Sequence, residues 1–326
     1  MSDWNTIALV LIVLTLLAGA TIAGQFLSQH PDRGLNPALV RTFNSRIRAY
    51  WLLLSILAAA FLGGSGGYGV TFALFGFLSF WALREFITLT PTRLGDHRAL
   101  FWVFFLFTPL QYLLVSFDQY GLYNVMIPVY AFLFILARVA IAGDYKRYLE
   151  RTAKIQAGLL ICVYSLSYAP AILHLKLGTY DYLGVKSAWE GSNSGLLFFF
   201  VVVVQFSDVL QFAWDSLLGK RVIAAHISPN KTWEGLAGGI GSTALLAMSL
   251  WWVTPFQPWV AGVMGMLISI MGFAGGITMS AVKRDRGVKD YGTLVVGHGG
   301  VLDRIDSICF AAPVFYHLTR AFYQLG

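Results

Sequence analysis

The chain contains an unbroken apolar run, Leu196-Leu197-Phe198-Phe199-Phe200-Val201-Val202-Val203-Val204, which is followed within a few residues by Ser207 and Asp208. A run that is apolar on every side predicts a helix buried in protein or lipid, because it has no polar face to turn toward water. A helix rises about 1.5 Å per residue, so about 20 residues cross roughly 30 Å of hydrocarbon. Residues 195–218 are therefore expected to span a membrane.

The same pattern recurs along the whole chain. The other predicted spans are 6–28, 48–63, 66–85, 99–117, 121–142, 155–176, 236–254, 259–280 and 306–324. The span 48–63 is short, and a glycine-rich breaker separates it from the next one, so the count is nine or ten. Only 12% of the 326 residues are charged, about half the fraction of a soluble domain. We therefore predict an all-α polytopic integral membrane protein with about ten transmembrane helices.

Basic residues are unevenly distributed between the connections. Most of the 23 Lys and Arg residues follow the first, third, fifth, seventh and ninth spans. Basic residues concentrate on the cytoplasmic side of membrane proteins, so these connections are expected in the cytoplasm, as in a bacterial-type inner membrane, with both termini on the other side. The net charge of +7 suits a protein that faces anionic lipid headgroups, and nothing indicates a nucleic-acid partner.

Polar residues are dense in two places, both on the predicted cytoplasmic side. At the first, Asp208 and Asp215 lie seven residues apart and so on nearly the same helix face. Intramembrane acids usually face a cation, a partner or water, which makes them candidates for a cation or substrate site. The alternative is a helix-end acid paired with Lys220 or Arg221.

The segment 227–235 follows this helix. Ser228 and Lys231 precede a predicted helix start, where free backbone N–H groups and the positive end of the helix dipole could bind a phosphate. An ordinary N-cap made by Thr232 or Ser228 is equally consistent with the pattern.

The second polar region is Ser280–Asp306. Lys283, Arg284, Arg286, Lys289 and Arg304 lie there with Asp285, Asp290, Asp303, Asp306 and His298 among flexible glycines. Asp303 and Asp306 are three residues apart, which puts both carboxylates on one helix face. Carboxylates hold Mg²⁺ together with substrate phosphates, and Lys or Arg neutralise a transferring phosphoryl group. Acids at a helix start are also ordinary dipole partners.

This region resembles the signature of the phosphatidate cytidylyltransferase (CDP-diacylglycerol synthase) family. The resemblance consists of Ser280, Lys283-Arg284, Lys289-Asp290, His298-Gly299-Gly300 and Asp303-Arg304 with Asp306. The segment 228–235 is similar to a second motif of the family, and the two cover roughly the last third of the chain. We accordingly separate N-terminal membrane helices, 1–190, from a C-terminal catalytic part, 191–326, within one integrated membrane domain.

The resemblance implies an enzyme of phospholipid biosynthesis that converts CTP and phosphatidate into CDP-diacylglycerol and pyrophosphate. Mg²⁺, or another divalent cation, would be held by Asp208, Asp290, Asp303 and Asp306; whether a monovalent cation accompanies it stays open. Asp303, Lys283, Arg304 and His298 would be catalytic. Ser228, Lys231, Ser280, Arg284 and Lys289 would bind the phosphates of CTP or lipid. Membrane lipids are the expected surroundings, and a homodimer is one option for the assembly.

The chain departs from the family pattern beside Asp208. Gln211-Phe212 stand where the family usually has Ala-Tyr, and Asp215-Ser216 replace a glycine and a basic residue. These changes leave the acceptor lipid open, including that of a divergent paralogue. Two alternatives are a CTP-dependent lipid kinase of the dolichol or phytol type, and a transporter lined by Arg138, Asp208 and Asp215.

Overall fold

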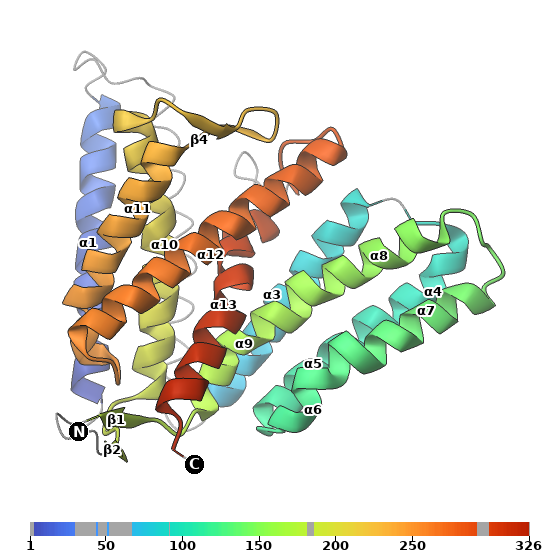
Figure 1. Ribbon diagram of the computed structural model, residues 1–326, viewed down its shortest axis with the longest axis horizontal. Coiled ribbons are helices and arrows are strands. Elements are labelled where there is room, and N and C mark those ends of the chain that lie inside the picture. Colours follow the sequence, from blue (N-terminus) through green and yellow to red (C-terminus); the bar gives the residue numbers. More distant parts are fainter. Residues whose placement is uncertain are drawn as a thin grey trace.

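A computed structural model describes residues 3–29, 44, 51, 67–90, 92–180, 186–291 and 300–325. It is a bundle of long helices with two short hairpins (Figure 1). In this part of the chain, seven helices are long and apolar enough to cross a membrane. The predicted all-α polytopic fold is thereby confirmed. The predicted span 48–63 lies outside the described residues except for Trp51.

The long uninterrupted helices are α1 (Asp3–Gln29), α3 (Gly67–Leu89), α10 (Asn193–Leu218) and α12 (Pro258–Asp285). Two more helices correspond to the predicted spans 236–254 and 306–324: α11 (Trp233–Ser249) and α13 (Leu302–Tyr323). They are not among the seven. α11 has only 17 residues, fewer than the roughly 20 that a span needs, and α13 begins with charged residues.

Three spans are built from shorter helices joined by π-helical turns. They are α4 (His97–Trp102) with α5 (Thr108–Ser116), α6 (Tyr120–Val125) with α7 (Phe132–Ile141), and α8 (Tyr148–Leu159) with α9 (Leu166–Ala171). The π turns lie at Val103–Phe107, Met126–Ala131 and Leu160–Ser165. At the first π turn the Val103 carbonyl accepts from the backbone N–H of Thr108 and, at 2.8 Å, from the Thr108 hydroxyl.

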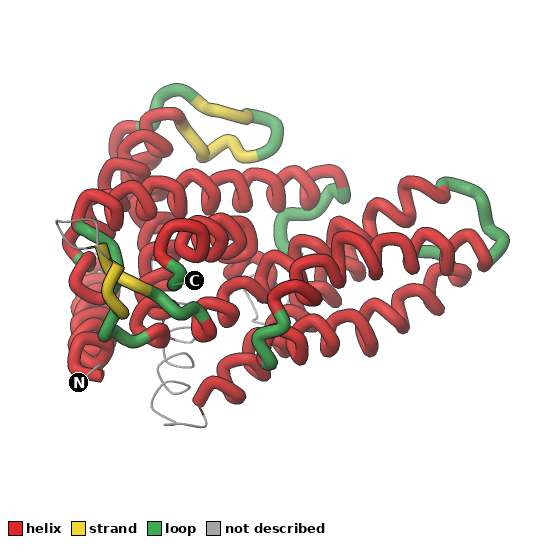
Figure 2. Tube along the Cα trace, turned by 60° about the horizontal axis from the view of Figure 1, so that its bottom comes forward, coloured by secondary structure: helices red, strands yellow, loops and turns green. Residues whose placement is uncertain are grey.

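Two antiparallel hairpins lie outside the helices (Figure 2). One pairs β1 (Gly178–Tyr180) with β2 (Lys186–Ala188), so that Gly178 is opposite Ala188. The other pairs β3 (Val222–Ala224) with β4 (Ser228–Thr232), so that Val222 is opposite Thr232. Figure 1 shows β3–β4 at the upper end of the molecule and β1–β2 at the lower end with both termini.

The basic connections that the structure describes share one end of the bundle, while the one after α1 lies outside the described residues except for Asn44. The α3–α4, α7–α8, α10–α11 and α12–α13 connections lie toward the upper or upper right part of Figure 1, while both termini lie at the lower end. This arrangement follows the alternation of basic and non-basic connections along the chain. One end of the molecule therefore gathers the positive charge, and the candidate site residues lie near it.

The core is centred on α10 and α13. Gly195 to Gln205 of α10 are buried on all sides, as the unbroken apolar run predicts. α13 packs against α10 and α12 on one side and against α9 and α3 on the other. Phe315 of α13 stacks on Phe200 of α10 with ring centroids 5.0 Å apart. α13 thus connects the C-terminal helices to the N-terminal ones.

A buried ion pair fixes the basic end of the N-terminal helices. Asp96 is 0% exposed and Arg151 is 4% exposed. The Arg151 Nη2 donates to Asp96 Oδ1 at 2.8 Å, and Nη1 donates to the carbonyls of Asp144 and Lys146, both at 2.9 Å. By contrast, the Arg93–Asp144 pair on the same face is partly exposed.

Asp96→Ala should lower the free energy of unfolding by about 3–5 kcal/mol, because it removes the buried acid that Arg151 binds and leaves this buried charge with only the partly exposed Asp144, at 3.0 Å, as an acidic partner. Arg93→Ala is the matched control. It removes a partly exposed pair that contributes about 0–1 kcal/mol, and it keeps the backbone N–H that Arg93 donates to Asp96. Thermal unfolding of the detergent-purified variants measures both. Equal melting temperatures of the two variants would contradict the stabilising role of the buried Asp96–Arg151 pair.

Candidate active site

Two acidic side chains from different helices meet at Ser307. The Ser307 hydroxyl donates to Asp208 Oδ2 at 2.9 Å and lies 3.1 Å from Asp208 Oδ1. The backbone N–H of Ser307 donates to Asp306 Oδ1 at 2.8 Å. Ser307 itself is buried, whereas both carboxylates are partly exposed. The second half of α10 and the start of α13 therefore present two carboxylates that both contact Ser307.

Asp303 lies one turn earlier on α13 and binds donors with both oxygens. The Lys283 ammonium donates to Oδ1 at 2.6 Å. The backbone N–H groups of Tyr291 and Gly300 donate to Oδ2 at 2.9 and 3.0 Å. Tyr291 and Gly300 stand on either side of residues 292–299, so one carboxylate holds both ends of this segment and positions Lys283.

Tyr291 also contacts Lys283 and α12. Its ring lies 5.4 Å from the Lys283 Nζ, and its hydroxyl donates to the Met279 carbonyl at 3.0 Å. Burial raises the pKa of the Tyr291 phenol. The group therefore stays protonated and remains a donor.

Lys283 and Arg284 are carried by the last turn of α12, which continues to Asp285 beyond the predicted end at residue 280. Basic residues are favourable there because they face the negative end of the helix dipole. Arg284 Nε donates to the Ile227 carbonyl at 3.2 Å and so links α12 to the β3–β4 hairpin. The Ser280 hydroxyl donates to the Gly276 carbonyl of its own helix at 2.7 Å.

The hairpin brings Ser228 and Lys231 to the site. Ser228 begins β4, and Lys231 Nζ donates to Gln211 Oε1 at 3.2 Å. Gln211 Nε2 in turn donates to Ser269 Oγ at 3.1 Å. Gln211 is 1% exposed, so its contacts fix the place of Lys231 beside α10 and α12.

The helix start after the hairpin has an ordinary cap. Thr232 Oγ1 accepts from the Gly235 N–H at 3.0 Å, which agrees with the N-cap interpretation. Asp215 does not pair with Lys220 or Arg221; its Oδ1 accepts from the N–H and hydroxyl of Thr232 at 2.9 and 2.7 Å. The backbone N–H of Arg221 instead binds Glu234 at 3.0 Å and lowers the pKa of that carboxyl group.

The remaining expected residues are distributed around this core. Lys289 and Asp290 are exposed on the connection after α12. The Arg304 carbonyl accepts from Gln205 Nε2 at 3.4 Å. His298 lies outside the described residues.

Sequence reasoning missed Ser307 and Glu85. Glu85 of α3 accepts from the backbone N–H groups of Val301 and Leu302 at the start of α13. The only sequence signal for Glu85 was its place at the end of an apolar run, and an acid in this place is equally typical of the connection that follows a membrane span.

The site's fit to a divalent cation rests on Asp208 and Asp306. In the part of the chain that the structure describes, no three His, Cys, Asp or Glu side chains form a metal-binding group. Mg²⁺, however, commonly uses one or two carboxylates and takes its other ligands from water and substrate phosphates. Asp208 and Asp306 supply this donor set, whereas Asp303 is engaged with Lys283.

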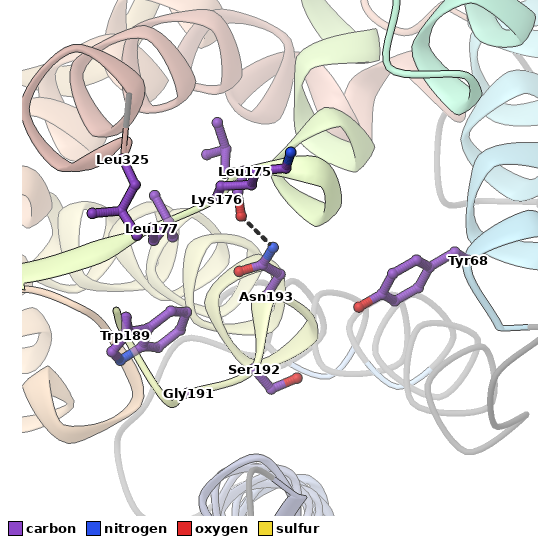
Figure 3. A pocket seen from close by; sticks show the side chains of 9 residues that line it. All are labelled: Tyr68, Leu175, Lys176, Leu177, Trp189, Gly191, Ser192, Asn193 and Leu325. Atoms are coloured by element: carbon purple, nitrogen blue, oxygen red, sulfur yellow. Dashed lines mark hydrogen bonds between the residues drawn. The ribbon is translucent and has the colours of Figure 1, made fainter. Parts of the chain in front are cut away.

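A separate polar cavity of about 380 Å³ lies at the opposite end of the molecule, near β1 and the C-terminus (Figure 3). Its lining includes Lys176, Ser192 and Asn193, and Asn193 Nδ2 donates to the Leu175 carbonyl at 2.7 Å. None of the expected site residues lines it. The candidate active site is therefore the carboxylate and lysine cluster at the basic end.

The chain is similar in sequence to known proteins over most of its length. The sequence profile of the Cytidylyltransferase family matches residues 44–322. The chain is 34% identical over 310 residues to the uncharacterized protein YnbB of Escherichia coli (strain K12), covering 94% of this chain and 96% of YnbB.

Phosphatidate cytidylyltransferases match over shorter segments. The Mycobacterium bovis protein of that name is 39% identical over 127 residues, which cover 38% of this chain and 41% of that protein. The Staphylococcus aureus (strain COL) protein of that name is 27% identical over 183 residues, which cover 53% of this chain and 70% of that protein.

Gly275→Ala should distort the site, because a Cβ there would lie 2.6 Å from the Asp306 carbonyl oxygen. A backbone atom cannot move away cheaply, and overpacking of this kind typically costs about 1–3 kcal/mol. Gly276→Ala is the matched control, since its Cβ would meet nothing within 4 Å. The melting temperature in detergent should fall for the first variant and stay level or rise for the second. A drop of equal size in both would refute the close contact.

Proposed function

The chain belongs to the cytidylyltransferase family, and we propose that it transfers the cytidylyl group of CTP to phosphatidate, giving CDP-diacylglycerol and pyrophosphate. A phosphate oxygen of the lipid attacks the α-phosphorus of CTP. The bond from that phosphorus to the oxygen bridging to the β-phosphate breaks, and pyrophosphate leaves. The observation that carries the proposal is the convergence of Asp208, Asp306 and the Lys283–Asp303 pair on three neighbouring helices.

The proposed reaction brings three groups of negative charge together, so the protein must neutralise and align them. Lys283 would contact the transferring phosphate, and Asp303 would hold the ammonium in place. Lys231, Arg284, Lys289 and Arg304 would bind the remaining phosphates, with hydrogen bonds from Ser228 and Ser280, and His298 would complete the set.

Asp208 and Asp306 would hold Mg²⁺ together with substrate phosphates. When bound there, the ion would reduce the charge on the phosphates and bring them into register. Asp290 is a further carboxylate that could complete the set from the connection after α12. Asp303 is assigned here to Lys283, because the three donors on its oxygens leave it less available to a cation.

We assign the site to the cytoplasmic face of the membrane. Support comes from the basic connections, which lie at the same end of the bundle as the β3–β4 hairpin and the end of α12 (Figure 1), and from the preference of Lys and Arg for cytoplasmic loops. At this interface a soluble nucleotide can meet a lipid headgroup while the acyl chains stay in the bilayer.

The test is pyrophosphate release from CTP by the detergent-purified protein with Mg²⁺, with and without phosphatidate. Release that depends on phosphatidate, together with a CDP-lipid product, is expected. CDP as the product would indicate a lipid kinase instead. Activity with another lipid phosphate but not with phosphatidate would show that the acceptor is a different lipid. No pyrophosphate release with any lipid phosphate would refute the proposal.

Asp303→Asn should lower turnover by about 100-fold or more, since loss of the charge frees Lys283 and small misplacements at a reacting centre cost about that much. The matched control is Asp285→Asn, which changes an exposed carboxylate two residues from Lys283. Steady-state pyrophosphate release measures both, and membrane insertion should be unchanged. Wild-type turnover in Asp303→Asn would refute the role.

The two acidic positions should also differ in their response to metal. EDTA is expected to abolish activity and added Mg²⁺ to restore it. Asp306→Asn should need about 10-fold more Mg²⁺ for half-maximal activity, because it removes a proposed ligand. The residual activity of Asp303→Asn should keep the wild-type Mg²⁺ requirement. A raised Mg²⁺ requirement in Asp303→Asn but not in Asp306→Asn would instead assign Asp303 to the cation.

A further inference from the structure

Glu85 is a buried carboxylate in the N-terminal half of the chain. It lies near the end of α3 and is only 5% exposed. Among the described residues, no Lys, Arg or His forms an ion pair with it. Burying a carboxylate is costly unless its oxygens are matched by donors. The donors here are two backbone amides: Val301 N–H to Oε1 at 3.0 Å and Leu302 N–H to Oε2 at 2.9 Å.

These amides open α13, where a helix has N–H groups without a partner inside the helix. A Ser, Thr, Asp or Asn side chain usually provides the partner. Val301 occupies the N-cap position and makes no such bond. Glu85 therefore replaces a local cap with one from another helix, and its charge also faces the positive end of the helix dipole.

Together with Asp303, Glu85 accounts for three consecutive amides. Gly300 N–H binds Asp303, while Val301 and Leu302 bind Glu85. The start of α13 is thus fixed from both sides, once by its own residue and once by α3. Because a protein carboxylate already neutralises this helix end, the phosphates of a substrate would have to bind elsewhere, for example at Lys283.

The first turns of α13 carry Asp303, Asp306 and Ser307, which make the contacts of the candidate site. We propose that Glu85 is a positioning residue for the transfer reaction: it fixes the start of α13 and thereby the alignment of Asp303 with Lys283 and of Asp306 with Asp208. This inference rests on the proposed function. It also makes the N-terminal membrane helices part of the active-site scaffold.

The first variant is Glu85→Gln. It keeps the size of the side chain, but its amide oxygen can accept from only one N–H while its NH₂ group faces the other. We expect kcat for pyrophosphate release to fall by about 10- to 100-fold, the usual cost of removing a group that orients active-site ligands. KM for CTP should stay within about 2-fold, because the phosphate-binding cations are untouched.

The control is Glu150→Gln. Glu150 is partly exposed at the start of α8 and forms an ion pair with Lys154. The Glu150→Gln variant loses the same charge but changes no contact with α13, so its kcat should equal that of the wild type. A fall of equal size in this variant would show a general effect of charge loss and overturn the proposal.

Backbone amide exchange provides a readout that does not depend on activity. Hydrogen–deuterium exchange in Glu85→Gln should accelerate in the peptide that contains Val301 and Leu302, and should stay at the wild-type level in peptides from α10 and α12. Acceleration across all helices would indicate global destabilisation, and unchanged exchange at 301–302 would disprove the contact. Either result overturns the proposal.

Val301→Pro is the second variant, and it tests the contact from the opposite side. Val301 has φ −62°, close to the roughly −65° that proline requires, and proline is tolerated at a helix start. The change removes the donor to Glu85 Oε1 and keeps the Leu302 N–H on Oε2. No NH₂ group is turned toward an N–H, so kcat should fall, but by less than in Glu85→Gln. Wild-type kcat in both variants refutes the positioning role. A wild-type protein that makes no CDP-lipid refutes the proposed function itself.

Discussion

A carboxylate taken out of water must be matched by donors or by a cation, and this constraint shapes the basic end of the bundle. Glu85 binds two amides of α13, and Asp303 binds two amides and Lys283. The Glu85 contacts join α3 to the start of α13, and the Lys283 contact joins α12 to α13. The polar groups that a transferase would need therefore also hold its helices together.

Asp208 and Asp306 are arranged differently. Ser307 links them, and they repel each other as like charges while remaining partly exposed. Two carboxylates at one site disfavour full ionisation unless positive charge arrives. A divalent cation with bound substrate phosphates would satisfy this need, whereas Asp303, already paired with Lys283, has much less to gain. This difference is the reason why the proposed cation is assigned to Asp208 and Asp306, while Asp303 is assigned to Lys283.

The sequence was most informative where its signal is local. Apolar length predicted the described spans, and the spacing of Asp303 and Asp306 predicted one shared helix face. Periodicity does not say which helix that face meets, so the contact of α13 with Asp208 came only through the resemblance. The π turns have no sequence signature. Glu85 could not be assigned, because its partners are backbone amides that carry no side-chain signal.

The departures from the family pattern beside Asp208 acquire a physical explanation in the fold. Gln211 lies one turn after Asp208, and its oxygen accepts from Lys231 while its nitrogen donates to Ser269. The alanine usual at this position could do neither. The longer side chain fits because it packs on Gly239, where a Cβ would lie 2.3 Å from the Gln211 Cγ. Asp215 acts further along the same helix and holds Thr232, the residue after Lys231. Both departures thus bear on where Lys231 is held, and neither side chain forms a hydrogen bond with Asp208 or Asp306. A change of acceptor caused by these departures would therefore act through the position of the lysine and not through the proposed cation site.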